Sequence, residues 1–366
     1  MIDGDALRAV FDAPSPPTVG IEEEVMLLDP ETLDLTPRSV ELLDRFGGDP
    51  RFALELPASH LEIVVGPAAT VGEAISAVAR GRLDLAAGVA GDVLLAGAGL
   101  HPFAAEEGEL NTGPRYDRTV AEHGRMAARQ LVCAVQIHVA VRGAERALAV
   151  HDAMRSYLPE LGALAANAPF YGGRDTGLAS ARPPVNGLLP RQGIPPALGS
   201  WDELAAALAW IGDPSRWWWE LRPHPQHGTL EVRVPDTQAT VADTAAVAAV
   251  AQALAVRLAE RFDDGETLPV HETWRIEENR RRAYGDGVEA TLRDLGTGVI
   301  VPARARLHAL MDELEPTAER LGCAAELASA RRLVERNGAM EQRAAGDPRR
   351  ATEWLVARFL DGLTGR

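Results

Sequence analysis

The sequence contains no lysine and almost no cysteine, and each absence excludes a class of chemistry. All 37 basic residues of this 366-residue chain are arginine. Without lysine there is no lysine nucleophile, no pyridoxal-phosphate Schiff base and no GxxxxGK[ST] phosphate loop. Phosphate must therefore be bound by arginine, a metal ion or backbone amides. Cys133 and Cys323 are too few for a disulfide framework and lack zinc-site or CxxC spacing, so we expect a reducing, cytoplasmic location.

The chain also lacks an excess of positive charge, a leader segment and an uninterrupted apolar run. Its formal net charge of −16 and pI near 5.1 argue against nucleic acid or an anionic membrane as a partner. Residues 1–17 have no basic start followed by an apolar stretch, so no signal peptide is expected. The longest apolar stretch, 241–258, is interrupted by Asp243, Gln252 and Arg257, which predicts a buried helix and not a membrane span.

Alternating and helical hydrophobic periodicities divide the chain into strands and helices. Strands are predicted at 19–29, 53–65, 93–98, 131–142, 216–222 and 229–235. Helices are predicted at 71–90, 117–130, 144–166, 201–211 and 238–262, and then, almost without interruption, at 272–295, 303–325, 327–343 and 348–362. The turn residues at 224–228 predict a hairpin, whose two strands are antiparallel. Strands mixed with helices and followed by a helical region predict an α+β fold.

Acidic or imidazole side chains interrupt four of these strands on the face opposite the apolar residues. Glu22 and Glu24 alternate along the first strand and therefore share a face. Two adjacent carboxylates on a rigid strand repel each other unless a cation lies between them. Similar positions recur in the later strand regions, and the whole set comprises Glu22, Glu24, Glu55, Glu62, His138 and Glu231.

For any one strand, the simpler interpretation is a solvated outer face of an antiparallel sheet. Solvated faces usually mix both signs of charge with serine and threonine, whereas here four strands offer glutamate or histidine at a central position. The joint pattern therefore favours a polar sheet face that binds a divalent metal. A set made mainly of carboxylates suits Mg²⁺ or Mn²⁺. Such ions opposite arginine are a common means of holding the triphosphate of a nucleotide.

Two further segments have no regular periodicity or an unusual composition. Residues 167–199 are rich in proline and glycine, and a loop of this length in a compact chain is typically functional. Phe170 and Tyr171 favour an ordered loop that covers the substrate side of the site. The three tryptophans at 217–219 are interpreted as core packing and not as a platform for a nucleobase.

Six segments resemble the carboxylate–amine ligase family known as glutamate–cysteine ligase type 2. They are GIEEEVMLLDP (20–30), LEIVVGP (61–67), GAGLHP (97–102), ANAPFYGGRDTGLASARPPV (166–185), WWELRPHPQHGTLEVRVPD (218–236) and ENRRRAYGDG (278–287). The resemblance implies a glutamine synthetase-like fold, in which a curved antiparallel sheet carries helices on its convex face and holds ATP and Mg²⁺ on its concave face. We expect one catalytic domain over 1–366, with a ligase core at 18–290 and a helical C-terminal extension at 291–366.

The same resemblance assigns roles to individual residues. The metal ligands are expected to be Glu22, Glu24, Glu55, Glu62, His138 and Glu231. Arg233 is expected to contact phosphate, and Arg182 the substrate carboxylate or the transferred phosphoryl group. Arg115 and Arg222 are further candidates for binding the nucleotide. The chain departs from its relatives at 133–136, where glycines are usual, and at 165–168, where serines are common, and both changes concern the acceptor side.

The activity implied is that of an ATP-dependent carboxylate–amine ligase, which activates an acid as an acyl phosphate and then forms an amide. Glutamate is the expected acid, and cysteine or another amine is the expected acceptor. The expected partners are these small molecules and ATP, with no nucleic acid or membrane, and a homo-oligomer is expected. Two alternatives stay open, a metal-dependent amide hydrolase on the same scaffold and a sensor that binds a nucleotide or amino acid without turnover.

Overall fold

The centre of the molecule is a seven-stranded sheet in which every pairing is antiparallel. The computed structural model describes residues 3–13, 16–212 and 216–363. The strand order is β2-β3-β1-β5-β9-β8, and β4 pairs with the C-terminal half of β1. The strands are β1 (Val19–Leu28), β2 (Phe52–Leu54), β3 (His60–Ala68), β4 (Leu94–Ala96), β5 (Val135–Ala140), β8 (Leu221–His224) and β9 (Thr229–Val232).

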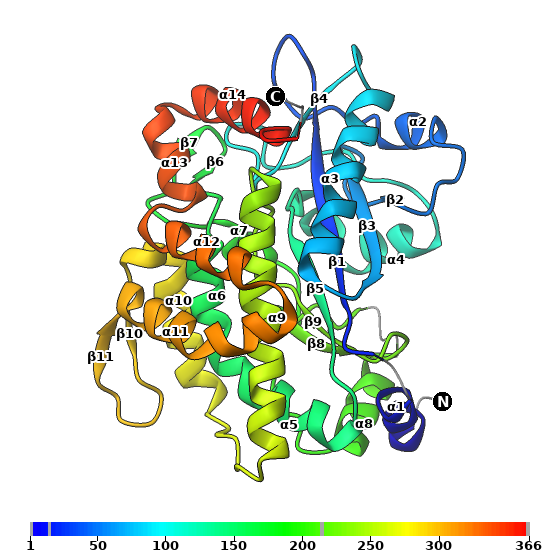
Figure 1. Cartoon of the computed structure of the whole chain (residues 1–366). Coiled ribbons are helices and arrows are strands. Elements are labelled where there is room, and N and C mark those ends of the chain that lie inside the picture. Colours follow the sequence, from blue (N-terminus) through cyan, green and yellow to red (C-terminus); the bar gives the residue numbers. More distant parts are fainter. Residues whose placement is uncertain (1–2, 14–15, 213–215, 364–366) are drawn as a thin grey trace.

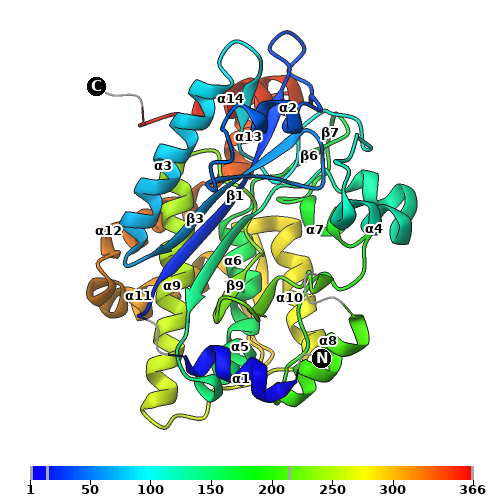
Figure 2. The ribbon, with the colours of Figure 1, turned by 90° about the vertical axis from the view of Figure 1, so that its right-hand side faces the viewer.

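Three helices cover one face of this sheet, as Figures 1 and 2 show. They are α3 (Val71–Gly88), α5 (Ala144–Met154) and α9 (Val241–Asp263), which contact β1, β3, β5 and β8. Helix α9 is long and apolar enough to cross a membrane by length and composition, but it is mostly buried inside the molecule. The prediction of a buried helix at this position is therefore confirmed. Its N-terminus is capped by Thr240, whose hydroxyl accepts a hydrogen bond from the amide of Asp243 at 3.1 Å.

Strand β1 shows how the sequence separates the two faces of the sheet. Val19, Ile21 and Val25 face the helices and are fully buried. Glu23 faces the same way, and its carboxylate pairs with the guanidinium of Arg82 on α3 at 2.7 Å. Glu22 and Glu24 point to the opposite face because successive side chains of a strand alternate. Of the three consecutive glutamates, Glu23 thus forms a buried ion pair on the helix-covered face, whereas Glu22 and Glu24 lie on the opposite, polar face.

The C-terminal helices pack against the same core. Helices α11 (Ala303–Leu321) and α12 (Ala324–Glu335) contact α9, and α14 (Pro348–Phe359) contacts β4. One large apolar cluster joins residues from both parts of the chain, for example Ile137, Leu254 and Leu314. The other helices are α1 (Gly4–Asp12), α2 (Ser39–Asp44), α4 (Pro114–His123), α6 (Leu158–Leu164), α7 (Arg182–Asn186), α8 (Trp201–Ile211), α10 (Thr273–Asp286) and α13 (Gly338–Ala345).

The α+β class and the antiparallel sheet are confirmed, but several predicted elements were wrong in extent, for example the helix predicted at 327–343, which is divided into two helices. The strand predicted at 53–65 is a hairpin, β2 and β3, because the chain turns through Pro57. The helix predicted at 144–166 is broken by a 3₁₀ turn at 155–157, and α6 restarts with Pro159 in its first turn. The helix predicted at 272–295 ends at Asp286, and β10 (Thr291–Arg293) and β11 (Ile300–Pro302) form a hairpin in the region that was predicted to be almost wholly helical.

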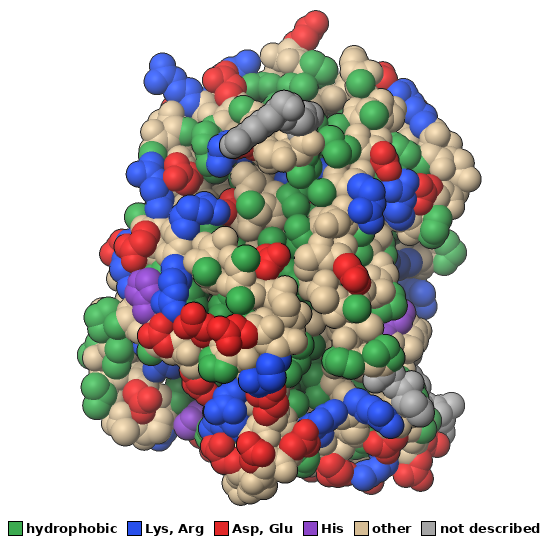
Figure 3. All heavy atoms as spheres, viewed as in Figure 1, with side chains coloured by type: hydrophobic (Ala, Val, Ile, Leu, Met, Phe, Trp, Pro, Cys, Tyr) green, Lys and Arg blue, Asp and Glu red, His purple; other side chains and the backbone are tan. Residues whose placement is uncertain are grey.

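This hairpin is also a distinct surface feature. Acidic and basic side chains are interspersed over the face drawn in Figure 3. Apolar side chains gather at its lower left, over the hairpin β10–β11 of Figure 1. Val299 and Ile300 at this place are 59% and 53% exposed.

Candidate active site

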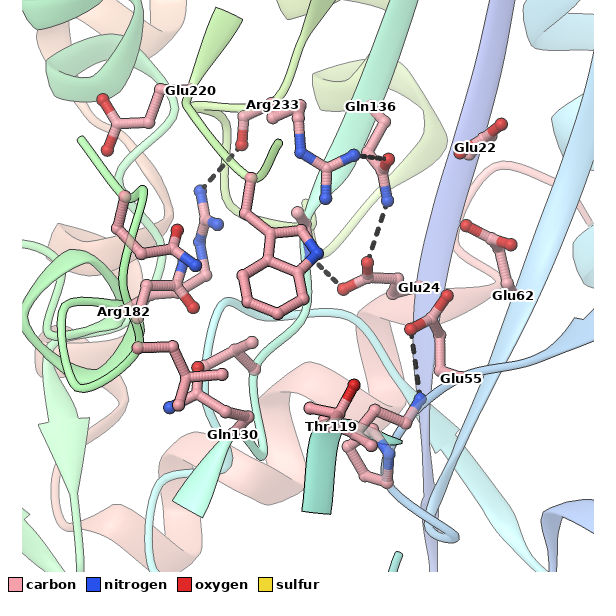
Figure 4. Close-up of a pocket in the computed structure, with 18 of the residues that line it drawn as sticks. Glu22, Glu24, Glu55, Glu62, Thr119, Gln130, Gln136, Arg182, Glu220 and Arg233 are labelled. Atoms are coloured by element: carbon pink, nitrogen blue, oxygen red, sulfur yellow. Dashed lines mark hydrogen bonds between the residues drawn. The ribbon is translucent and has the colours of Figure 1, made fainter. Parts of the chain in front are cut away.

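The second face of the sheet lines a cavity of about 390 Å³. In the strand register, Glu24 lies opposite Glu62, Glu22 lies opposite Gln136, and Glu231 lies opposite His138. Cross-strand partners share a face, so these side chains form one continuous polar surface. Figure 4 shows several of them converging on the cavity. The structure brings all six predicted metal-type residues to this surface and divides them into two groups.

The first group, which we call the three-glutamate cluster, consists of Glu24, Glu55 and Glu62. One carboxylate oxygen of each lies within 4.8 Å of the others. Glu24 accepts hydrogen bonds from the amide of Ala134 at 2.7 Å and from the side chain of Gln136 at 2.9 Å. Glu62 is 9% exposed, and its carboxylate accepts no hydrogen bond from any residue that the structure describes. Glu55 follows β2 in the turn to β3.

The protonation of this cluster reflects its crowding. Burial, reinforced by the charge of Glu55, raises the pKa of Glu24 to about 8. Burial and the neighbouring carboxylates also raise the pKa of Glu62 well above its ordinary value. Two buried carboxylates and one half-buried carboxylate that resist ionisation together form a site where a divalent cation lowers the electrostatic energy. The oxygen-only donor set fits Mg²⁺ or Mn²⁺.

The second group, the histidine cluster, consists of Glu22, His138 and Glu231. One donor atom of each again lies within 4.8 Å of the others. His138 Nε2 is 3.4 Å from a carboxylate oxygen of Glu22, and it is buried without a hydrogen-bond partner among the described residues. His138 Nδ1 lies 3.0 Å from the hydroxyl of Thr229. A proton on Nδ1 donated to Thr229 leaves the lone pair of Nε2 free for a cation.

Two arginines form ion pairs with Glu231 of the histidine cluster. Arg222 Nε donates to one carboxylate oxygen at 2.5 Å, and Arg233 Nη1 donates to the other. Burial alone would raise the pKa of Glu231, but Arg233 and Arg222 outweigh it and hold the pKa below its usual range. Glu231 is fully buried, and a buried carboxylate without a counter-charge would be neutral. It is ionised because these two arginines pair with it.

Gln136 connects the two clusters. Its side-chain amide donates to Glu24, and its oxygen accepts a hydrogen bond from Arg233 Nη1, as the dashed lines of Figure 4 show. The sequence pattern places Gln136 on the polar face but assigns it no role. Its position opposite Glu22 in the β1–β5 register is the signal that identifies it, and this register requires the structure.

The remaining predicted arginines differ in how they are held. Arg182, at the start of α7, is 4% exposed, and its Nε donates to Asp236 at 2.7 Å. It also donates to the carbonyl of Val234 at 2.5 Å and lines the cavity. The sequence did not single out Asp236 as its anchor. Arg115, in the first turn of α4, is exposed at the cavity, with its guanidinium 5.8 Å from the ring centre of Tyr116.

The loop 167–199 is ordered by short elements and lies beside the cavity. It contains β6 (Phe170–Tyr171), β7 (Arg174–Asp175) and α7, and Asn186, Leu189 and Gln192 line the cavity. The interpretation of the tryptophan run is right for Trp217, which is buried in the core. It is wrong for Trp218, which lines the cavity and lies under the guanidinium of Arg191, 5.4 Å from the ring centre.

Comparisons of the sequence with known proteins agree on one protein family. The model of the glutamate-cysteine ligase family 2 (GCS2) matches residues 18–353. A protein of Rubrobacter xylanophilus provisionally named glutamate–cysteine ligase 2-3 is 40% identical over 329 residues, covering 87% of this chain and 88% of that protein. A Frankia alni protein provisionally named glutamate–cysteine ligase 2-1 is 34% identical over 377 residues, covering 97% and 98%.

Solved structures show the same fold at low sequence identity. The glutamate–cysteine ligase of Francisella tularensis in complex with AMP superposes with a TM-score of 0.66 at 13% identity, covering 96% of this chain and 91% of that one. A bifunctional glutathione synthetase of Pasteurella multocida gives a TM-score of 0.64 at 12% identity, covering 99% of this chain and 54% of that one.

Proposed function

This chain belongs to the glutamate–cysteine ligase family 2, and we propose that it joins glutamate to cysteine or to another small amine at the expense of ATP. As a member of this family it is an ATP-dependent carbon–nitrogen ligase. The observation that carries the proposal is the cavity itself. The three-glutamate cluster, Glu22 and the predicted arginines line it, and His138 and Glu231 lie next to Glu22 on the same face of the sheet.

The residues of the cavity supply the charges that such a reaction needs. The three-glutamate cluster and the histidine cluster present carboxylate oxygens and one imidazole nitrogen, a donor set that fits Mg²⁺. MgATP, when bound, supplies the γ-phosphoryl group that a substrate carboxylate attacks, giving an acyl phosphate and ADP. The amine then displaces phosphate from the acyl group and forms the amide.

We propose that the arginines bind and position the negatively charged groups of ATP and of the acid substrate. Arg115, Arg222 and Arg233 line the cavity and are proposed to contact the polyphosphate. Arg182, fixed by Asp236, is proposed to hold the acid substrate or the transferred phosphoryl group. Positioning and charge neutralisation are the main sources of rate acceleration in phosphoryl transfer, so no nucleophile from the protein is needed.

Nucleotide turnover in the purified protein tests the proposal directly. ADP release is measured with Mg²⁺, ATP and glutamate, alone and with cysteine and a panel of amines, and the amide product is identified by mass spectrometry. Release that requires both acid and amine is the expected result. Amide cleavage without ATP would identify a hydrolase, and nucleotide binding without turnover would identify a sensor. The cytoplasmic location and the homo-oligomer remain predictions.

A further inference from the structure

Segment 189–194 lies between α7 and α8 and forms part of the cavity wall. Leu189 and Gln192 line the cavity, and Arg191 of the same segment covers the ring of Trp218, which also lines it. A segment between two helices keeps a defined position only when contacts with other elements hold it there. The contacts that hold this segment therefore decide the shape of the wall.

Helix α10 supplies two of these contacts. Glu277 Oε1 accepts a hydrogen bond from the amide of Ile194 at 2.8 Å, and Arg280 Nη1 donates to Glu277 Oε2 at 3.3 Å. Gly193 lies directly against this pair of side chains. A Cβ added to it would lie 2.5 Å from Glu277 Oε1 and 3.4 Å from the guanidinium carbon of Arg280, and its φ is +86°. This close approach requires glycine.

The same arginine joins the segment to the sheet. Arg280 Nε donates to Glu220 Oε1 at 2.8 Å, and its Nη2 lies 2.7 Å from the same oxygen. Glu220 is buried and lines the cavity immediately before β8. Its amide donates to the carbonyl of Gly193 at 3.0 Å, and its carbonyl accepts from the amide of Arg233 at 2.8 Å. The guanidinium of Arg280 thus links α10, segment 189–194 and the β8–β9 hairpin.

We propose that Arg280 is a positioning residue, which holds segment 189–194 against the cavity by pairing with Glu220 and Glu277 and so sets the affinity for the acid and amine substrates. The proposal rests on the proposed function, because these are the substrates of that reaction. Without Arg280, two neighbouring carboxylates lose their common counter-charge, and the segment loses its connection to the sheet.

The position of the segment explains why these substrates, and not the nucleotide, should be affected. Figure 4 shows Glu220 and Arg182 on one side of the cavity and the three-glutamate cluster on the other. Arg182, proposed to hold the acid, begins α7, the helix that leads into the segment. Arg233, proposed to contact the polyphosphate, is held separately by its bonds to Glu231 and Gln136. A displaced segment therefore leaves the side chain of Arg233 in place.

The surroundings of Arg280 demand a guanidinium. Only 14% of its side chain is exposed, and its donors reach two carboxylates at the same time. The ring of Tyr284 lies 5.5 Å from the guanidinium carbon and contributes a cation–π contact. A lysine ammonium is a compact point charge on a flexible stem and does not reproduce this planar fork. Arg280→Lys should therefore restore only part of what Arg280→Gln removes.

Steady-state kinetics separate positioning from a general loosening of the site. In Arg280→Gln we expect the KM for glutamate, for the amine, or for both to rise about tenfold, while the KM for ATP changes by less than about twofold. Arg280→Lys should give intermediate values. A rise in the KM for ATP, alone or equal to the others, or no rise in any KM, would overturn the proposal. Arg281→Gln, at a side chain that is 59% exposed on the same helix, is the matched control.

Gly193→Ala keeps the test valid if Arg280→Gln folds poorly. The substitution leaves both ion pairs of Arg280 chemically intact, but its added methyl group pushes the segment away from Glu277. It should reproduce the KM pattern of Arg280→Gln. Wild-type KM values in a folded Gly193→Ala would refute the role of the segment.

Limited trypsin digestion measures the hold on the segment without any turnover. Cleavage after Arg191 is followed by the mass of the fragment that ends there. It should be about tenfold faster in Arg280→Gln and in Gly193→Ala than in the wild type and in Arg281→Gln. Equal rates would overturn the proposal. Failure of the proposed function would instead appear in the wild type itself, as the absence of ADP release with every acid and amine.

Discussion

Glu23 and Arg82 form an ion pair in which neither side chain is exposed to solvent. The pair lies under the sheet, on the face opposite Glu22 and Glu24. Thr244 on α9 donates a third hydrogen bond to the carboxylate, at 2.9 Å. Arg82 in turn donates to the main-chain carbonyls of Gln238, Ala239 and Phe359. All the polar atoms of the pair are thus satisfied, which a buried ion pair requires.

Arg82→Met should therefore destabilise the protein strongly, because Glu23 would be left buried without its counter-charge. We expect the free energy of unfolding to fall by about 3–5 kcal/mol. Arg80→Met, on the exposed face of the same helix, is the matched control and should change it by less than about 0.5 kcal/mol. Urea unfolding monitored by circular dichroism measures both, and equal effects of the two substitutions would contradict this role of Arg82.

Glu24→Gln should abolish turnover without weakening the fold. The substitution removes a metal-type ligand, and we expect the rate of ADP release to fall by roughly 100-fold or more. Thermal stability without metal should be equal or higher, because the substitution relieves repulsion among crowded carboxylates. Glu31→Gln, in an exposed loop, is the control. Wild-type Mg²⁺-dependent activity in Glu24→Gln would refute the metal assignment of this cluster.

Arg115→Ala should affect nucleotide binding and little else. Arg115 is exposed and has no ion pair among the described residues, so its removal should leave the melting temperature unchanged. Loss of one charged hydrogen bond to phosphate should raise the KM for ATP about tenfold. Steady-state kinetics with Arg118→Ala, one turn further along α4, provides the comparison. An unchanged KM for ATP would remove Arg115 from the proposed site.

The contribution of His101 to the stability of the fold should decrease as the pH falls below 6.5. The ring of His101 accepts from the amide of Ala104 at 2.9 Å and lies 2.8 Å from the carbonyl of Leu33, an arrangement that fits only the neutral imidazole. Burial lowers the pKa of His101 to about 4. Between pH 6.5 and 4 His101 therefore binds a proton more readily in the unfolded chain than in the folded one, and its contribution to stability rises with pH in this window.

The contribution of His101 is at most about 3 kcal/mol over that range. His101→Gln removes the titrating group, so its free energy of unfolding should depend less steeply on pH between 6.5 and 4 than that of the wild type. Denaturant unfolding at several pH values measures the two slopes. The variant can be less stable at every pH without affecting the comparison, whereas parallel slopes would show that His101 is not responsible.

The alternation of side chains along a strand was the sequence pattern that predicted most of the site. It placed Glu22 and Glu24 on one face of β1 and predicted that Glu62, His138 and Glu231 project from equivalent faces of later strands. It could not predict the division into two clusters, because that division depends on register and on which strands are neighbours. Register is a long-range property, and the sequence of a single strand does not contain it.

Other features depended on partners distant in the sequence. Arg82 is 59 residues from Glu23, and the side chain of Arg233 reaches Gln136, 97 residues earlier, so no local pattern could reveal either contact. The hairpin at 291–302 was missed for a different reason. Its strands are three residues each, too short for a periodicity to show, although the turn sequence from Asp294 to Gly298 was a usable signal.

The reach of Arg82 has a consequence for how the molecule is completed during synthesis. Its guanidinium donates at 2.9 Å to the carbonyl of Phe359, 277 positions along the chain, at the very end of α14. In a growing polypeptide that has emerged only as far as α12, the guanidinium of Arg82 lacks one of its hydrogen-bond acceptors, because Phe359 has not yet emerged. We expect hydrogen exchange to show full protection of the early strands only after α14 has left the ribosome.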